Sequence, residues 1–63
     1  MDPDHAQLAS VATVLDDLTA RISEVADRHR GGPHEDLTID LDEVERSLRS
    51  ASRRLAHTLR RLA

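Results

Sequence analysis

Four histidines, at positions 5, 29, 34 and 57, are the residues of this chain best suited to bind a metal or to move a proton at neutral pH. Catalytic and metal-binding histidines often stand at short helical spacings beside a carboxylate, as in His-Glu-x-x-His. That spacing is missing here, and the chain has no cysteine. His29 continues an apolar stripe and is expected to be a half-buried polar cap on a core. The sequence therefore predicts no catalytic residue, no metal site and no cofactor, and a protein that is not an enzyme.

The charged residues are divided along the chain. All twelve acids lie between Asp2 and Glu45, and three arginines accompany them, so the first 45 residues have a net charge of −9. The remaining 18 residues, Arg46 to Ala63, contain six arginines and no acid, a net charge of +6. Such a division favours charge pairing, either between the two halves of the chain or with a partner.

The first half of the chain has the pattern of a long amphipathic helix. Asp2 is placed to be the N-cap and Pro3 to occupy the first helical position. Gly31 can adopt a positive φ and Pro33 cannot continue a helix, so the helix is expected to cover about residues 3–30. Its apolar residues alternate spacings of three and four, as in a coiled coil, and they are Leu8, Val11, Leu15, Leu18, Ile22 and Val25.

A second helix is expected over about residues 41–62. Asp40 and Glu43 have the spacing of a capping box, with Asp40 as the N-cap. The loop between the helices would cover about residues 31–39, and Leu37 and Ile39 would fold back over the end of the hairpin. The apolar stripe of this helix contains Leu41, Val44, Leu48, Leu55, Leu59 and Leu62.

These elements predict an all-α fold, an antiparallel two-helix hairpin forming a single domain over residues 1–63. Residues whose numbers sum to about 70 would lie side by side, which places Asp16 and Asp17 near Arg53 and Arg54. The same register places Glu24 near Arg46, and the segment 27–30 near the segment 40–43. One hairpin cannot cover both apolar stripes, because each stripe has one helical neighbour and one side open to water. A second copy would cover them in a homodimeric four-helix bundle. A hetero-complex, a higher oligomer and a marginally folded monomer remain alternatives.

The sequence also indicates which residues form the assembly and which face outward. The core and dimer contacts are expected to come from the two stripes, that is, Leu8, Val11, Leu15, Leu18, Ile22, Val25, Leu41, Val44, Leu48, Leu55, Leu59 and Leu62. Arg46, Arg53 and Arg60 share one outward heptad position, with Arg49 beside them. This row is either a solvated face or a binding surface for an acidic protein. Nucleic acid is a weaker candidate, because the chain has a net charge of −3 and no aromatic residue to stack on bases.

Two resemblances cover parts of the chain. The helix-loop-helix outline is similar to the small subunit of exodeoxyribonuclease VII, but that family's Gly-x-x-x-Leu-Glu turn has no counterpart in residues 31–36. The segment 43–61 resembles the helix of actinobacterial anti-sigma proteins that bind cyclic di-GMP, with motif Glu-x3-Ser-x2-Arg-x3-Gln-x3-Asp. Glu43-x3-Ser47 and Ser50-x2-Arg53 match out of register, and His57 and Arg61 stand where Gln and Asp are needed. No ligand residue is carried over and no family is assigned.

The expected function is a small helical dimerisation and protein-interaction module with a regulatory role. An anti-sigma-like or cyclic-dinucleotide-binding regulator and a small nucleic-acid-associated protein are the alternatives. The first residues lack the basic and apolar regions of a signal peptide, and no apolar run reaches the ~18 residues of a membrane span. We therefore expect a cytoplasmic protein that does not enter a membrane.

Overall fold

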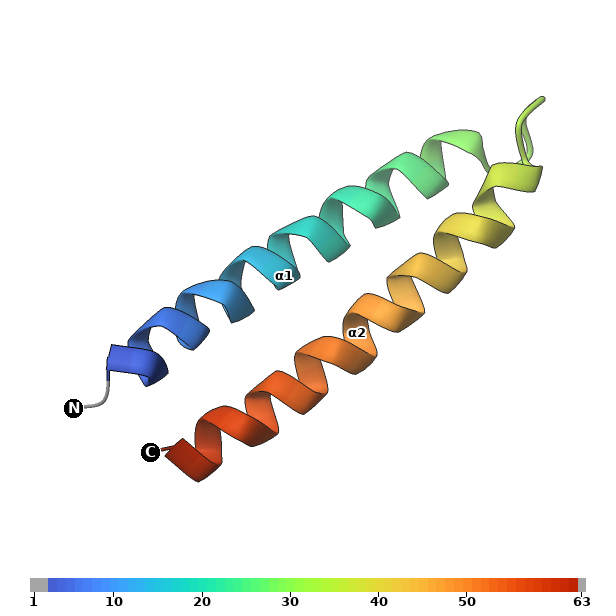
Figure 1. Cartoon of the computed structure of the whole chain (residues 1–63). Helices are drawn as coiled ribbons and strands as arrows, with labels where there is room; N and C mark the ends of the chain where they lie inside the picture. Colours follow the sequence, from blue (N-terminus) through green and yellow to red (C-terminus); the bar gives the residue numbers. More distant parts are fainter. Residues whose placement is uncertain (1–2, 63) are drawn as a thin grey trace.

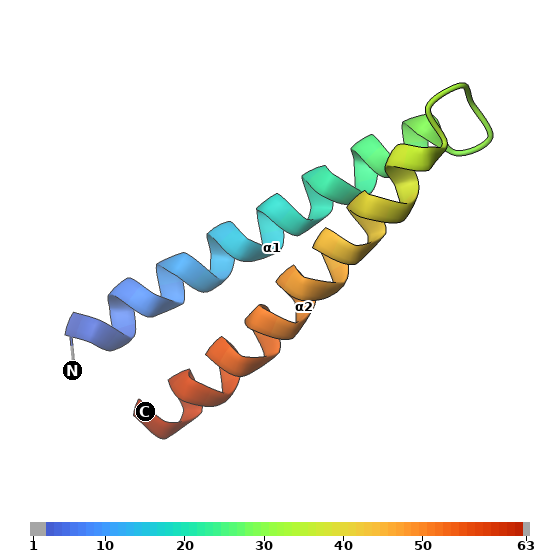
Figure 2. The same cartoon turned by 45° about the vertical axis from the view of Figure 1, so that its right-hand side comes forward.

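A computed structural model describes residues 3–62, which form two long antiparallel helices joined by a short loop (Figure 1). Helix α1 covers Pro3–His29 and helix α2 covers Asp36–Leu62. The two helices pack along each other, and the first turn of α1 and the last turn of α2 lie at the end opposite the loop (Figure 2). This confirms the predicted all-helical hairpin. None of the described helices is long and apolar enough to cross a membrane.

The ends of α1 agree with the sequence prediction where the structure describes them. Pro3 is the first helical residue and Asp4 places a negative charge in the first turn, where the helix dipole favours it. The expected N-cap, Asp2, lies outside the described residues. At the other end Arg28 and His29 occupy the last turn, and Gly31 has a φ of 74°. The helix thus ends on a glycine in the left-handed region, as predicted.

Replacing Gly31 by valine is expected to lower the free energy of unfolding by about 1–2 kcal/mol, because a β-branched residue is strained at positive φ. An added Cβ would meet no atom within 4 Å, so the cost is conformational and not steric. Gly32→Ala is the matched control, since Gly32 has no positive φ and its new Cβ would make only ordinary contacts. Chemical denaturation of both variants measures the difference. Equal unfolding midpoints would contradict the left-handed cap.

Helix α2 begins at Asp36, five residues before the predicted start, and the loop is correspondingly shorter. The Thr38 amide and the Thr38 hydroxyl both donate to the Glu35 carbonyl, at 2.9 Å and 2.6 Å. Asp36 supplies the acidic charge of the first turn. The predicted capping box was therefore wrong, because Asp40 lies inside the helix. Leu37 and Ile39 are also helical and exposed, so they do not fold back over the end of the hairpin.

The two helices meet along a different set of positions from the one predicted. With Leu8 and Leu41 at heptad position a, the most buried residues lie at position e: Thr19, Ala26, Thr38 and Glu45, each at most 8% exposed. The remaining e residues, His5, Ala12, Ser52 and Leu59, are half-buried. The a residues that lie beside them, such as Leu15 and Leu48, are also half-buried. We call these e positions the small-residue row, since most of them carry small side chains that permit close helix approach.

The d positions, by contrast, are turned away from the neighbouring helix. Val11 is 43% exposed, Leu18 41% and Val44 44%. Ala51 and Thr58 are exposed and Val25 is half-buried. A single hairpin therefore leaves the d residues of the predicted core and dimer contacts largely uncovered. We call these six residues the d row. Position d also holds Asp4 and Leu37, in the first turns of the two helices, and both are exposed.

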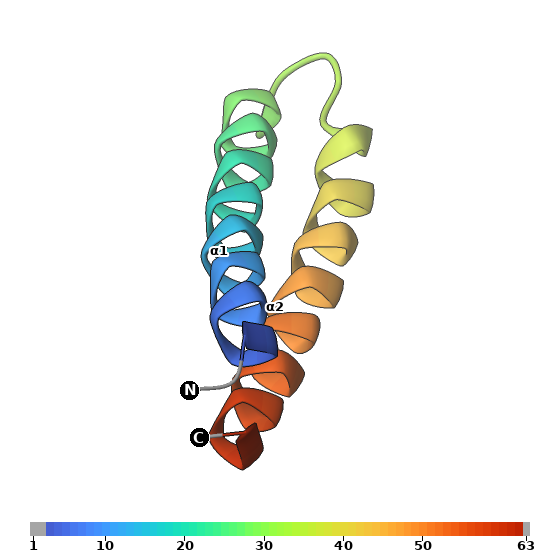
Figure 3. The same ribbon diagram turned by 60° about the vertical axis from the view of Figure 1, so that its left-hand side comes forward.

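The hairpin is a single layer of helices. Its extents are 50 × 14 × 10 Å and its radius of gyration is 14.7 Å, against about 11 Å for a compact domain of this length. Figure 3 views the pair from another side and shows no third element over either broad face. The accessible surface of 4816 Å² also exceeds the about 4000 Å² of a compact 7.0 kDa monomer. Both broad faces of the hairpin are thus open in a single copy.

Candidate interaction surface

Three of the four predicted partner-binding arginines form a row on α2. Arg46, Arg53 and Arg60 are spaced by seven residues and all are exposed. This outer arginine row extends for about 21 Å, from the helical rise of 1.5 Å per residue. With Leu41 at position a, the three arginines stand at heptad position f. This position lies about 160° around the helix from position d, so the row points away from the exposed apolar residues of the d row.

Arg49, the fourth predicted residue, differs from the other three because it already has a partner. It forms an ion pair with Glu45, one turn earlier on the same helix. The Glu45 side chain is only 9% exposed, whereas that of Arg49 is 62% exposed. Arg49 therefore neutralises a buried carboxylate, and it is less available to an acidic partner than the outer arginine row.

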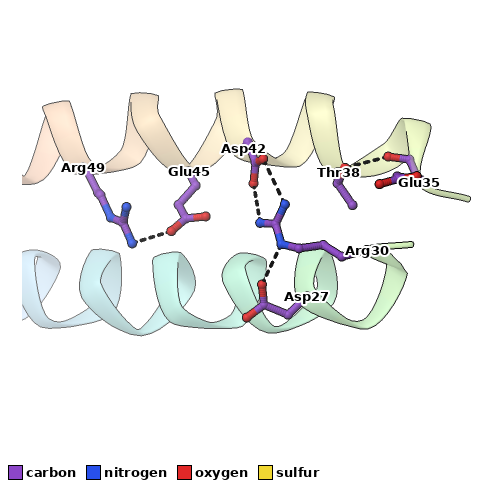
Figure 4. A network of polar contacts seen from close by, with 7 residues as sticks. All are labelled: Asp27, Arg30, Glu35, Thr38, Asp42, Glu45 and Arg49. Atoms are coloured by element: carbon purple, nitrogen blue, oxygen red, sulfur yellow. Dashed lines mark hydrogen bonds and ion pairs between the residues drawn. The ribbon is translucent and has the colours of Figure 1, made fainter. Parts of the chain in front are cut away.

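Arg30 is the residue that ties the helices together by charge. Its guanidinium donates to Asp42 of α2, with nitrogen–oxygen distances of 2.9 Å and 3.3 Å, and to Asp27 of α1 at 3.0 Å (Figure 4). Hydrogen bonding from Arg30 lowers the pKa of the Asp42 carboxyl below its ordinary value, although desolvation opposes this. The same bonds raise the pKa of Arg30. This is the pairing predicted between the segments 27–30 and 40–43.

The other predicted cross-helix pairs do not form. Asp17 pairs with Arg21 of its own helix at 3.1 Å, and Asp16 accepts a hydrogen bond from the Ser52 hydroxyl at 3.4 Å. Glu24 makes no ion pair with Arg46 in the described structure. The physical reason is the position of the arginines. Positions f and g of α2 lie on its far side, so their guanidinium groups do not reach the acids of α1.

Most of the basic tail consequently has no ionic partner within the hairpin. Between residues 3 and 62, no ion pair within 4.0 Å includes any of the arginines at f and g of the tail, namely Arg46, Arg53, Arg54, Arg60 and Arg61. Folding of one copy therefore leaves the charge division found in the sequence largely uncompensated.

The structure adds two features that the sequence prediction missed. Glu45 is a charged residue buried between the helices, and an open hollow of about 440 Å³ is lined by Asp40, Glu43, Val44, Ser47 and Leu48. On α2, Glu45 lies seven residues after Thr38 and seven before Ser52, and this repeat of small polar residues was a signal for its buried position. The hollow gave no signal in the sequence, since it depends on which side of α2 stays uncovered.

The histidines contribute one contact at the loop. The rings of His29 and His34 lie edge to face, with centroids 5.9 Å apart, and His29 is half-buried as predicted. Among residues 3–62 no group of three histidine, aspartate or glutamate side chains is arranged to hold a metal ion.

Comparisons of the chain with protein-family models, with curated proteins and with solved structures gave no match.

Proposed function

We propose that this chain is a non-enzymatic interaction module of the cytoplasm, which self-associates as a four-helix bundle and presents the outer arginine row to an acidic protein partner. The observation that supports the partner surface is that Arg46, Arg53 and Arg60 make no ion pair within 4.0 Å in the described hairpin, although acids outnumber bases in the chain. Arg46 has only a longer-range attraction to Asp42. Three exposed guanidinium groups in line match carboxylates displayed along a helix or strand.

Self-association is supported by the shape of the molecule. A stable domain normally encloses its apolar residues between two layers of secondary structure, and this chain provides one. The exposed d row and the outer arginine row lie on nearly opposite sides of α2. A second copy that covers the apolar side would therefore leave the arginines free, and the two proposed contacts would be compatible.

A pair of matched double variants tests the arginine surface. Arg53→Gln with Arg60→Gln removes two charges of the outer row, whereas Arg28→Gln with Arg54→Gln removes two exposed charges outside that row. The free energy of unfolding of both variants should lie within about 1 kcal/mol of the wild-type value, since exposed charges contribute little to stability. Only the first double variant should bind the partner more weakly, with an affinity lower by about tenfold or more.

The measurement is capture from nuclease-treated lysate on immobilised wild-type and variant protein, followed by binding constants for the captured protein at several salt concentrations. Binding by the wild type should weaken as salt is added. Equal loss in both double variants, or capture that disappears with nuclease, would contradict an acidic protein partner for this row.

A further inference from the structure

One broad face of the hairpin is apolar and the other is polar. In an antiparallel pair that packs through positions a and e, the d rows of both helices lie on one face and the b rows on the other. The cross-helix pair of Arg30 and Asp42 joins two b positions, and Asp16 of the b row binds Ser52. The apolar face carries instead the d row, whose larger members Val11, Leu18 and Val44 are more than 40% exposed.

The two ends of the hairpin differ in charge. The loop end, residues 24–45, contains two arginines and eight carboxylates, a net charge of −6. The open end, residues 3–15 and 53–62, contains four arginines and one carboxylate, a net charge of +3. Two hairpins stacked with their loops together would place like charges against each other. Two hairpins stacked head to tail would place unlike charges together.

The hollow on α2 marks the acidic end of the apolar face. Its lining contains the d residue Val44, with Leu48 beside it and the carboxylates Asp40 and Glu43 at its edge. A chain end that provides an aliphatic stem and a positive charge fits this lining. The last turn of α2 provides both, through exposed Arg61 and exposed Leu62.

We propose that the apolar face docks a second copy of this chain head to tail, with the two-fold axis running across both helices, between the stacked faces, at the level of Leu18 and Ala51. This inference rests on the proposed self-association and specifies its geometry. Asp16 and Ser52 contact each other, so Leu18 and Ala51, whose numbers have nearly the same sum, lie level in the hairpin. Antiparallel stacking about that level places Leu18 opposite its own copy and Ala51 opposite its own copy.

The same two-fold rotation pairs the other residues of the apolar face. Along α2, Val44 lies opposite Thr58 of the second copy and Asp40 lies opposite Arg61 of the second copy, so the arginine enters the hollow. Along α1, Val11 lies opposite Val25 of the second copy.

Single-cysteine variants test this register, because the natural chain has no cysteine. Ala51→Cys is expected to form a disulfide between copies, since its two copies face each other at the axis. Val44→Cys is the control, because its two copies would be about 21 Å apart along the axis. Oxidation of Ala51→Cys should be on the order of a hundredfold faster at micromolar protein, as the dimer raises the effective thiol concentration to the millimolar range. A mixture of Val44→Cys and Thr58→Cys should cross-link as well.

The molar mass of each reduced variant is measured by light scattering before oxidation. This measurement tests the self-association separately from the head-to-tail register. A monomeric mass would overturn both the self-association and the register. A dimer in which Ala51→Cys does not cross-link, while a mixture of Leu18→Cys and Ala51→Cys does, would overturn the head-to-tail register and leave the dimer standing. A dimer without either cross-link would mean that the copies meet on another face.

Charge reversal provides a second readout that needs no disulfide. Asp40→Arg and Arg61→Asp should each weaken the dimer about tenfold, and the double variant should restore it. The two positions are 21 residues apart on one straight helix, about 30 Å, so restoration must occur between copies. If the double variant dimerises no better than either single variant, Asp40 and Arg61 do not meet between copies and the proposal is wrong.

Discussion

Leu18→Asp is expected to convert the protein from a dimer of about twice 7.0 kDa into an unfolded monomer at micromolar concentration. In a single hairpin Leu18 is 41% exposed, and a carboxylate there would cost little. In the proposed bundle two carboxylates would face each other across the axis without a partner, a loss of roughly 3–5 kcal/mol. Because a small one-layer hairpin has little stability of its own, dissociation and unfolding are expected together.

Light scattering coupled to size exclusion and thermal melting over a range of protein concentrations measure this effect. The melting temperature of the wild type should rise with concentration. Ala20→Asp is the matched control, since Ala20 is an exposed residue two positions away on the outward side of α1. A wild type that is folded and monomeric at every concentration, or a Leu18→Asp variant as stable as Ala20→Asp, would refute the proposed bundle.

Glu45→Met is expected to stabilise the protein by about 1–3 kcal/mol. The Glu45 side chain is 9% exposed and its ion pair is with Arg49, which remains solvated when the glutamate is removed. The free energy needed to desolvate a buried carboxylate exceeds the stabilisation from one partly exposed ion pair. Methionine fills a similar volume without a charge. For a domain of this size the melting temperature should rise by roughly 4–8 °C for each kcal/mol.

Glu24→Met serves as the control, since Glu24 is exposed on α1, makes no ion pair in the described structure, and its replacement should change stability by less than about 0.5 kcal/mol. Chemical denaturation at a fixed protein concentration compares the two variants. A destabilised Glu45→Met variant would show that the carboxylate has a favourable role in the packed hairpin beyond its pairing with Arg49.

Local residue patterns were sufficient to predict the helices and the turn between them. Apolar spacings of three and four require helical geometry, and Gly31 with Pro33 ends the first helix by a backbone constraint that does not depend on the neighbouring helix. The start of the second helix was missed. The sequence favoured Asp40 as a cap, but α2 begins at Asp36, with the Thr38 amide and hydroxyl bound to the Glu35 carbonyl.

The arginine surface was predicted in part. The heptad positions of Arg46, Arg53 and Arg60 were enough to place them outward, because position f points away from a helix partner in any register. The pairing of Arg49 was not foreseen. It depends on the burial of Glu45, which follows from how closely the two helices approach and not from the spacing of residues 45 and 49 alone.

The sequence by itself determined that the chain forms two amphipathic helices, an antiparallel hairpin and a divided charge distribution, since these depend on local geometry and composition. Only the tertiary structure decided which part of each apolar stripe the hairpin buries. Small side chains at Ala12, Thr19 and Ala26 allow the helices to approach closely, and this rotates the contact from positions a and d to positions a and e. The same rotation leaves Leu18 and Val44 exposed on one face.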